Sequence, residues 1–205
     1  MGWYDAHVLP RAIDLLLSNP RALDIRRRVT AGLAGDVLEI GFGSGLNLPY
    51  LPSTVTSVKA VDPSGTAVRI ARSRIDDCPV PVEIIGLDGQ LLPLPDASVD
   101  AVLSTWTLCT IPDAVAAVRE VRRVLRPGGA LHFVEHGLAE SPGLQRWQHR
   151  LDPIQQRIAG GCHLDREITA ILADGGLAIR ELNRYFGAGM PKPLGALYEG
   201  IAVAS

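Results

Sequence analysis

Three glycines at alternate positions, Gly41, Gly43 and Gly45 in the segment DVLEIGFGSGLN, are the strongest chemical signal in the sequence. Glycine is needed where a backbone turns sharply and where a ligand lies against it with no Cβ between them. A dinucleotide-binding turn follows the pattern GxGxxG, which would put the third glycine at position 46, where this chain has leucine. The earlier third glycine favours S-adenosylmethionine over a pyrophosphate, although glycine-rich turns also occur in ordinary loops.

Acidic residues follow the next two strand-like runs. Asp62 ends the run VKAV, where a carboxylate can accept hydrogen bonds from two ribose hydroxyls. Asp88 follows the run VEII and can accept from an exocyclic adenine amine. Each aspartate alone is better explained as a cap of a neighbouring helix or turn. Because the glycines and both aspartates fall at the same end of three successive strands, a nucleoside-binding edge is the better interpretation.

The elements that must position these residues are short apolar runs rich in β-branched side chains, as is typical of strands buried on both faces of a parallel sheet. These runs are 37–40, 58–61, 82–85, 99–105 and 130–135. Between them, Val115, Val118, Val121 and Leu125 recur three or four residues apart, which predicts a helix over 113–125 with one buried stripe. The alternation predicts an α/β fold with a doubly wound, mostly parallel sheet.

The last third of the chain has a different pattern. Ser141 and Pro142 are typical of a helix start, and we expect Pro153 to end that helix. The remaining predicted elements are a helix over 164–174 and two strands over 177–186 and 197–205. A strand pair at the end of the chain predicts an antiparallel addition to the sheet.

Composition limits the class of protein. The chain has 205 residues, 22 acidic and 20 basic, and is 47% hydrophobic, which suits one globular domain and excludes a strongly basic nucleic-acid binder. Three cysteines are too few for a disulfide framework, and no apolar run approaches the length of a membrane span. We therefore expect a cytoplasmic protein with no nucleic-acid partner, whose oligomeric state stays open.

In order and spacing, the motifs VLEIGFGSGLN, AVDPS, LDGQLLPLPDASVD and LRPGGALHFVEH resemble those of class I S-adenosylmethionine-dependent methyltransferases over about residues 34–136. The resemblance implies a Rossmann-like, seven-stranded sheet with a reversed last strand. It also implies a cofactor site made of Glu39, Gly41, Gly43 and Gly45 at the methionine end, Asp62 at the ribose, and Asp88 with the Gly89 amide at the adenine. We add Asn47, Pro63 and Thr105 to this expected set. The chain then divides into an N-terminal helical segment over 1–34, a cofactor-binding core over 35–136, and acceptor-side helices with the terminal strand pair over 137–205.

A second resemblance narrows the acceptor. TLCTIPD, VEHG, RWQHRLDP and GGCHLDREITAIL resemble segments of the alkyl-thiol S-methyltransferases, from residue 34 nearly to the end. Animal members of that family carry an N-terminal membrane-associating segment. The first residues of this chain, interrupted by Asp5, Arg11 and Asp14, do not resemble one. A small-molecule acceptor, and a thiol in particular, is therefore the favoured expectation.

The candidate acceptor-side residues are chosen by position. His136 follows the fifth strand and is either a general base or a histidine packed at a strand end. The other candidates are Trp106, Glu135, Trp147, Cys162 and His163. We expect no metal, because no second cysteine or histidine lies at ligand spacing in the sequence. Arg26, Arg27 and Arg28 are interpreted as a solvated helix face.

Three alternatives stay open. The acceptor could be methylated on oxygen, nitrogen or carbon instead of sulfur. A nicotinamide-dependent oxidoreductase uses a related sheet, although Leu46 argues against it. A catalytically silent cofactor-binding module would also fit, because the acceptor half of the chain is less clearly marked than the cofactor half.

Overall fold

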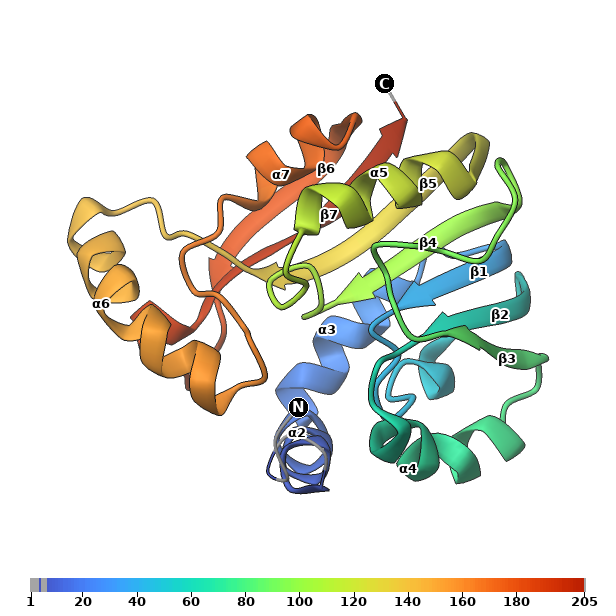
Figure 1. Ribbon diagram of the computed structural model, residues 1–205, viewed down its shortest axis with the longest axis horizontal. Coiled ribbons are helices and arrows are strands. Elements are labelled where there is room, and N and C mark those ends of the chain that lie inside the picture. Colours follow the sequence, from blue (N-terminus) through green and yellow to red (C-terminus); the bar gives the residue numbers. More distant parts are fainter. Residues whose placement is uncertain (1–3, 5–6, 205) are drawn as a thin grey trace.

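The computed structural model describes residue 4 and residues 7–204, and its centre is a seven-stranded sheet with strand order β3-β2-β1-β4-β5-β7-β6 (Figure 1). Its strands are β1 (Gly35–Ile40), β2 (Val55–Val61), β3 (Val82–Gly86), β4 (Val99–Thr105), β5 (Leu125–His136), β6 (Leu177–Phe186) and β7 (Ala196–Ala204). The first five strands are parallel, and β7 pairs antiparallel with both β5 and β6. The predicted α/β sheet with a reversed terminal strand is confirmed. Asp5 and Ser205, which entered the sequence analysis, lie outside the described residues.

Helices cover both faces of this sheet (Figure 1). Helices α3 (Pro20–Thr30) and α4 (Gly65–Asp76) lie on one face, and α5 (Ala114–Val124) and α7 (Ile168–Asp174) lie on the other. Helix α2 (Leu9–Leu17) precedes α3, and α6 (Pro142–Ile158) lies beyond the carboxyl ends of the parallel strands. None of the helices in the described part of the chain is long and apolar enough to cross a membrane.

Side-chain alternation along the strands creates two core layers. Leu38 and Val102 pack with Val118 and Val121 of α5, whereas Val37 packs with residues of α3 in the second layer. Successive side chains in a strand point to opposite faces, so Glu39 shares the face of Val37 and points toward α3. The same rule places Thr105 of β4 on the α3 side. Two polar side chains therefore lie beneath one helix at the end of the sheet.

The connections differ from the sequence analysis in two places. After the glycine turn the chain forms only a three-residue 3-10 helix, η1 (Leu48–Tyr50). Among the described residues no helix lies between β3 and β4; that stretch contains Pro93 and Pro95, and proline disfavours helical backbone at itself and at the residue before it. The predicted alternation of strands and helices is therefore wrong for these two connections.

The helical expectations for the last third also need correction. Pro153 does not end α6, which continues to Ile158. Side chains anchor the helix beside the proline: Gln148 donates to the carbonyls of Gly137 and Leu164, and Asp152 accepts from the Leu164 amide. These contacts offset the one backbone hydrogen bond that proline removes. The next helix, expected over 164–174, begins only at Ile168, because the preceding residues form the turn that Asp152 holds.

Candidate functional site

The glycine turn follows β1 and joins two strand ends. Gly41 approaches the loop after β4 so closely that a Cβ there would lie 1.9 Å from Oγ1 of Thr107, and its φ of +69° is in the left-handed region. Gly43 also has a positive φ, of +58°, but a Cβ at this position would meet nothing closer than 4.0 Å. The turn therefore needs Gly41 for packing, whereas Gly43 leaves open space above the backbone that a ligand can fill.

Asp62 connects this turn to the end of β2. Its Oδ2 accepts from the Gly43 amide at 2.7 Å, and its Oδ1 accepts from the Ser64 amide at 2.7 Å. Burial raises the pKa of the Asp62 carboxyl, and the two backbone hydrogen bonds oppose that shift. Each carboxylate oxygen has a second acceptor position, so Asp62 can still accept from a diol. Pro63, the next residue, is exposed.

A buried polar network fills the space between α3 and the ends of β1 and β4. Nη1 of Arg26 donates to Oδ1 of Asn47 at 2.8 Å and to Oγ1 of Thr105 at 3.2 Å. Nδ2 of Asn47 donates to Oε1 of Glu39 at 2.7 Å. The Arg26 guanidinium also lies over the ring of Trp106, 4.9 Å from its centroid. The structure thus brings Glu39, Asn47 and Thr105 together, and it adds Arg26 to them.

Two atoms of this network lack partners among the described residues: Nε of Arg26 and Oε2 of Glu39. Burial raises the pKa of Glu39 to about 8 and lowers that of Arg26 to about 10. A buried donor and a buried acceptor left unsatisfied are costly, so both sites call for a ligand with complementary groups. The carboxylate and ammonium groups of a methionine moiety supply both. The residues present therefore fit S-adenosylmethionine.

The adenine end is more open. Asp88 is exposed, and its Oδ1 accepts from the backbone amide and the side-chain amide of Gln90 at 2.8 and 3.0 Å. These hydrogen bonds lower the pKa of the Asp88 carboxyl, so it is ionised at neutral pH. Gly89 is half-buried beside Ile111 and Ile40. Asp88 therefore holds its own turn, and its second oxygen stays available as an acceptor.

Two of the acceptor-side candidates, Trp106 and Cys162, lie at the carboxyl ends of β4 and β5. Trp106 packs under Arg26. Sγ of Cys162 lies 3.4 Å from Nδ1 of His136. Glu135 is fully buried and accepts from Oγ of Ser104 at 2.6 Å and from the Cys109 amide at 3.1 Å, so its oxygens are engaged in the fold. Trp147 on α6 is 54% exposed and contacts Arg150.

His163 and Cys162 occupy a turn ahead of α7. Nδ1 of His163 lies 3.3 Å from Oδ2 of Asp152 and 3.1 Å from Nε2 of Gln156, and its amide donates to the Cys109 carbonyl at 2.8 Å. Because α7 begins at Ile168, Cys162 does not lie at the start of that helix. This turn instead packs against the loop that follows β4.

Sequence reasoning missed Arg26 and Cys109. Arg26 is 4% exposed and not part of a solvated face, a correction that the helix period could have supplied. Ala22, Ile25 and Val29 form the buried stripe of α3, and residue 26 falls on it. For Cys109 there is no comparable signal. It reaches His136 and Cys162 only through the fold, and the three potential ligand atoms lie within 4.8 Å of one another.

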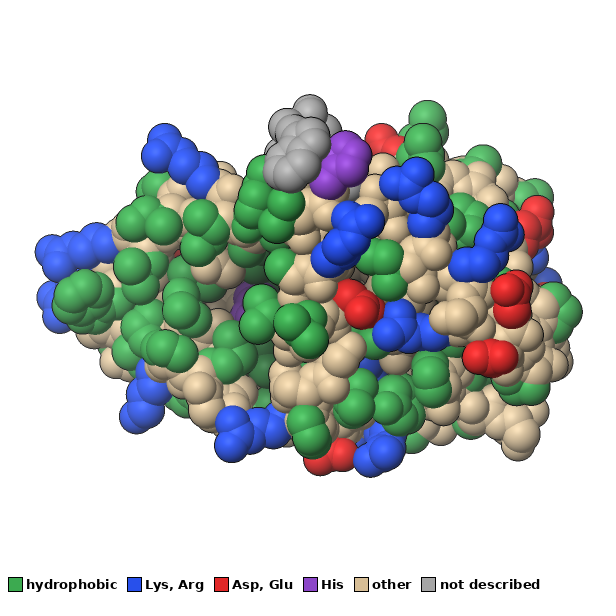
Figure 2. Space-filling view, turned by 90° about the horizontal axis from the view of Figure 1, so that it is seen from below, with side chains coloured by type: hydrophobic (Ala, Val, Ile, Leu, Met, Phe, Trp, Pro, Cys, Tyr) green, Lys and Arg blue, Asp and Glu red, His purple; other side chains and the backbone are tan. Residues whose placement is uncertain are grey.

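The surface on the side of α2 and α6 is hollowed between groups of hydrophobic side chains, and a histidine side chain is visible inside the hollow (Figure 2). Exposed apolar residues on these helices include Leu15 and Leu16 of α2 and Ile154 and Ile158 of α6. This side also faces the carboxyl ends of the parallel strands, where ligands bind in open α/β sheets (Figure 1).

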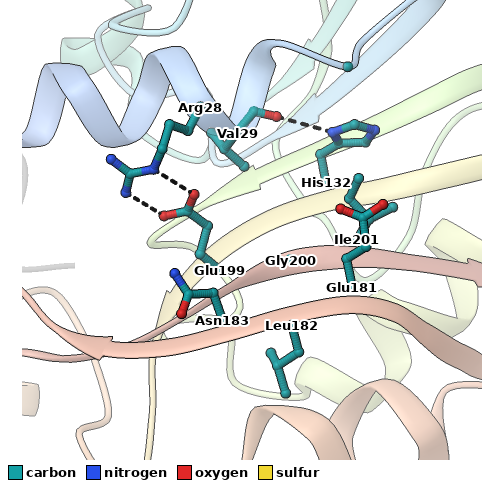
Figure 3. Close-up of a pocket in the computed structure, with 10 residues that line it drawn as sticks. Arg28, Val29, His132, Glu181, Leu182, Asn183, Glu199, Gly200 and Ile201 are labelled. Carbon is teal, nitrogen blue, oxygen red and sulfur yellow. Dashed lines mark hydrogen bonds and ion pairs between the residues drawn. The ribbon is translucent and has the colours of Figure 1, made fainter.

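A separate cavity of about 280 Å³ lies between α3 and the strands β5, β6 and β7 (Figure 3). Its wall contains the ion pair in which Nε and Nη2 of Arg28 contact Glu199 at 3.0 and 2.7 Å. His132, also in the wall, is held by its Nδ1 against the Val29 carbonyl at 3.1 Å. None of the candidate residues lines this cavity. It is therefore distinct from the glycine turn and from the ends of β4 and β5.

Comparison with known proteins finds methyltransferases. A family model described as "Methyltransferase domain" matches residues 38–133. The chain is 32% identical over 169 residues to thiol S-methyltransferase TMT1B of Rattus norvegicus, covering 79% of this chain and 68% of that protein. It is 31% identical over 161 residues to phosphatidylethanolamine N-methyltransferase of Cereibacter sphaeroides, covering 76% and 78%.

A solved structure shows the same fold over nearly the whole chain. It is the methyltransferase in a complex with the Trm112 methyltransferase activator from Haloferax volcanii, with a TM-score of 0.73, 18% identity, and coverage of 98% of this chain and 96% of that one. The sheet order, the glycine turn and the relatives agree with one another. The chain belongs to the class I S-adenosylmethionine-dependent methyltransferases.

Proposed function

We propose that this enzyme methylates the sulfur of a small-molecule thiol. The cofactor supplies a methyl group on a positively charged sulfonium, and transfer disperses that charge, so an apolar site that excludes water favours the reaction. Glu39, Arg26 and Asn47 would hold the methionine end, and Asp62 the ribose. Their task is to keep the methyl group at a fixed place above the ends of β1 and β4, because positioning can supply most of the rate enhancement.

The observation that carries the thiol proposal is the chemistry at the ends of β4 and β5. The groups there are the Cys109 and Cys162 thiols and the His136 imidazole, and the nearby Glu135 carboxylate is fully buried and hydrogen bonded. A cationic amine acceptor would need a free carboxylate, whereas a thiol with a pKa of about 8.5 is partly ionised near neutral pH and needs modest help. His136 is partly exposed, whereas both cysteines and Glu135 are buried, and we propose that His136 assists ionisation of the acceptor.

A second candidate is methylation of an amine, supported by the likeness to the phosphatidylethanolamine N-methyltransferase of Cereibacter sphaeroides. An alkyl ammonium group with a pKa of about 10.4 is almost fully protonated at neutral pH, so this reaction requires a stronger base than a thiol does. The buried Glu135 does not offer one. O- and C-methylation lack a specific supporting observation.

An acceptor screen tests the proposal. Release of S-adenosylhomocysteine is measured in parallel with alkyl thiols, phenols, primary amines and phosphatidylethanolamine vesicles, using Asp62→Ala as the matched cofactor-deficient control. We expect turnover with thiols that disappears in the control. Turnover confined to amines or to the phospholipid would replace the thiol proposal with N-methylation.

A further inference from the structure

Two thiols and one imidazole from three separate segments meet beyond the carboxyl ends of β4 and β5. Cys109 follows β4, His136 ends β5, and Cys162 lies in the turn after α6. Sγ of Cys162 lies 3.5 Å from Sγ of Cys109 and 3.4 Å from Nδ1 of His136, and Sγ of Cys109 lies 4.0 Å from the same nitrogen. Both cysteines are buried free thiols, and His136 is partly exposed.

The triangle has the dimensions of three corners of a tetrahedral zinc site. With Zn–S near 2.3 Å and Zn–N near 2.05 Å, tetrahedral geometry requires about 3.8 Å between two sulfurs and about 3.6 Å between sulfur and nitrogen. The three observed distances of 3.5, 3.4 and 4.0 Å each lie within about half an ångström of those values. A disulfide would require the sulfurs to approach to about 2.05 Å, much further from the observed separation.

We propose that Cys109, His136 and Cys162 bind Zn²⁺ and leave its fourth coordination position open for the acceptor thiol. This inference rests on the proposed thiol methylation and specifies how the thiol is ionised. Thiolate and imidazole ligands suit zinc, and three protein ligands with one open position are typical of catalytic zinc. No fourth histidine, cysteine or carboxylate joins the group among residues 7–204, and the partly exposed His136 marks its open side.

The backbone around Cys109 is fixed in a way that suits a ligand. The Cys109 amide donates to Oε2 of Glu135 at 3.1 Å, and its carbonyl accepts from the His163 amide at 2.8 Å. The loop after β4 is thereby tied both to β5 and to the turn that carries Cys162. Such supporting hydrogen bonds orient ligands before a metal binds, and their loss typically weakens metal affinity about 10- to 100-fold.

The group also lies at a useful distance from the cofactor site. In the sheet, β5 is separated from β1 by β4 alone, so its end lies about 10 Å, or two strand spacings, from the glycine turn. The proposed metal site and the glycine turn therefore lie at the same edge of the sheet, with the end of β4 between them. The proposal requires the acceptor sulfur and the donor methyl group to meet above that strand end.

The reaction balances without an oxidant or reductant. The acceptor thiol coordinates zinc and releases its proton to solvent, because a coordinated thiol is deprotonated. A lone pair of the bound sulfur forms the new bond to the methyl carbon. The bond from that carbon to the sulfonium breaks, and its electron pair stays on the sulfur of S-adenosylhomocysteine. The thioether product carries no charge, binds zinc weakly and leaves.

Metal content provides the direct test. The full chain is prepared under reducing conditions, loaded with Zn²⁺ and dialysed, and its zinc is measured by mass spectrometry and by competition with a chromogenic chelator. Cys109→Ser and Cys162→Ser should each weaken zinc binding about 100-fold or more. The controls Cys78→Ser, outside the group, and Asp165→Asn, in the neighbouring Asp152–His163–Asp165 group, should bind zinc like the parent. Equal zinc binding in all five proteins, or none in the parent, would overturn the proposal.

Cobalt substitution separates this inference from the proposed function. Co²⁺ in the site should show a thiolate-to-cobalt charge-transfer band, and an added alkyl thiol should change that band while S-adenosylhomocysteine affinity stays constant. Zinc binding without any thiol turnover would support the metal site and reject thiol methylation. Thiol turnover that continues after complete removal of zinc would support thiol methylation and reject the metal site. Mass analysis that finds a Cys109–Cys162 disulfide in the active protein would also reject the metal site.

Discussion

The amide of Gly43 donates a 2.7 Å hydrogen bond to Oδ2 of Asp62, and this contact joins the ends of β1 and β2. The glycine turn and the strand-end carboxylate are therefore one unit and not two adjacent motifs. Since the other carboxylate oxygen binds the Ser64 amide, the orientation of Asp62 is set by the backbone before any ligand arrives. A diol bound at this carboxylate meets a preorganised acceptor.

We predict that Asp62→Ala lowers affinity for S-adenosylhomocysteine at least tenfold. Hydrogen bonds to a charged group contribute about 1.5–3 kcal/mol, and the substitution removes the acceptor from two hydroxyls. Isothermal titration calorimetry measures the affinity, and circular dichroism checks the fold. Asp88→Ala provides the comparison: Asp88 is exposed, water screens its interactions, and we expect a smaller loss. Parent-like binding by Asp62→Ala would place the ribose elsewhere.

A second prediction concerns the buried arginine of α3. Arg26→Gln should weaken S-adenosylhomocysteine binding about 10- to 100-fold, because it removes the cation whose Nε has no partner among the described residues. Arg27→Gln is the matched control on the same helix: Arg27 is exposed and pairs with Asp24. An equal effect of the two substitutions would show that Arg26 acts only through the general charge of α3.

The pH dependence of cofactor binding follows from Glu39. Burial raises its pKa to about 8 from an ordinary value of 4.5, so the ligand-free protein holds Glu39 mostly protonated at pH 7. An ammonium group requires the carboxylate, so affinity should rise as pH increases from about 6 to 8, by up to tenfold per unit. Calorimetry across this range measures the slope. Glu39→Gln cannot ionise and should bind weakly with no such slope.

The raised pKa of Glu39 also predicts how the stability of the ligand-free protein changes with pH. Its pKa is higher in the folded state than in the unfolded chain, so the folded state holds this proton more tightly. The resulting contribution to the free energy of unfolding is complete below about pH 4.5 and is lost as pH rises through about 8. Relative to Glu39→Gln, the parent should therefore lose thermal stability over that interval. If the thermal stabilities of the two proteins changed with pH in parallel, this would contradict the buried, protonated state of Glu39.

The sheet was predictable because its strands are buried on both faces and are therefore short runs in which apolar residues predominate, such as Val99–Thr105. The course of α6 was not, because Gln148 and Asp152 of this helix bind backbone groups of Gly137 and Leu164 outside it and so override the local preference of Pro153. Propensity describes a segment alone, whereas these anchors depend on residues distant in the chain.

The candidate site divides in the same way. Glu39 lies in β1, Gly43 lies in the turn after β1, and Asp62 directly follows β2, so short sequence motifs can identify them. Arg26 required attention to the helix period, which places it among Ala22 and Val29. The contact between Cys109 and Cys162 spans 53 residues and joins two irregular segments. No spacing rule covers such a pair, because the geometry comes from the packing of the turn after α6 against the loop that follows β4.

The last prediction concerns His136. Whether it acts as a base or as a zinc ligand, its contribution is to ionise the acceptor, so His136→Ala should lower turnover of an alkyl thiol about 10²- to 10⁴-fold at neutral pH. Most of this loss should return at high pH, where solvent already generates the thiolate. His149→Ala, an exposed histidine paired with Asp165, serves as the control and should behave like the parent.

An aromatic thiol sharpens the same test, because its lower pKa makes it ionised at neutral pH without help from the enzyme. His136→Ala should therefore slow the aromatic thiol far less than the alkyl thiol, measured as the ratio of the two kcat/KM values in variant and parent. Equal losses for both acceptors at every pH, in a folded protein that still binds S-adenosylhomocysteine, would mean that His136 positions the acceptor and does not ionise it. The zinc content of His136→Ala then distinguishes the two ionising roles. If His136 is a general base, the substitution leaves zinc binding unchanged. If His136 is a ligand, zinc binding is weakened, because its Nδ1 is the nitrogen that faces both sulfurs.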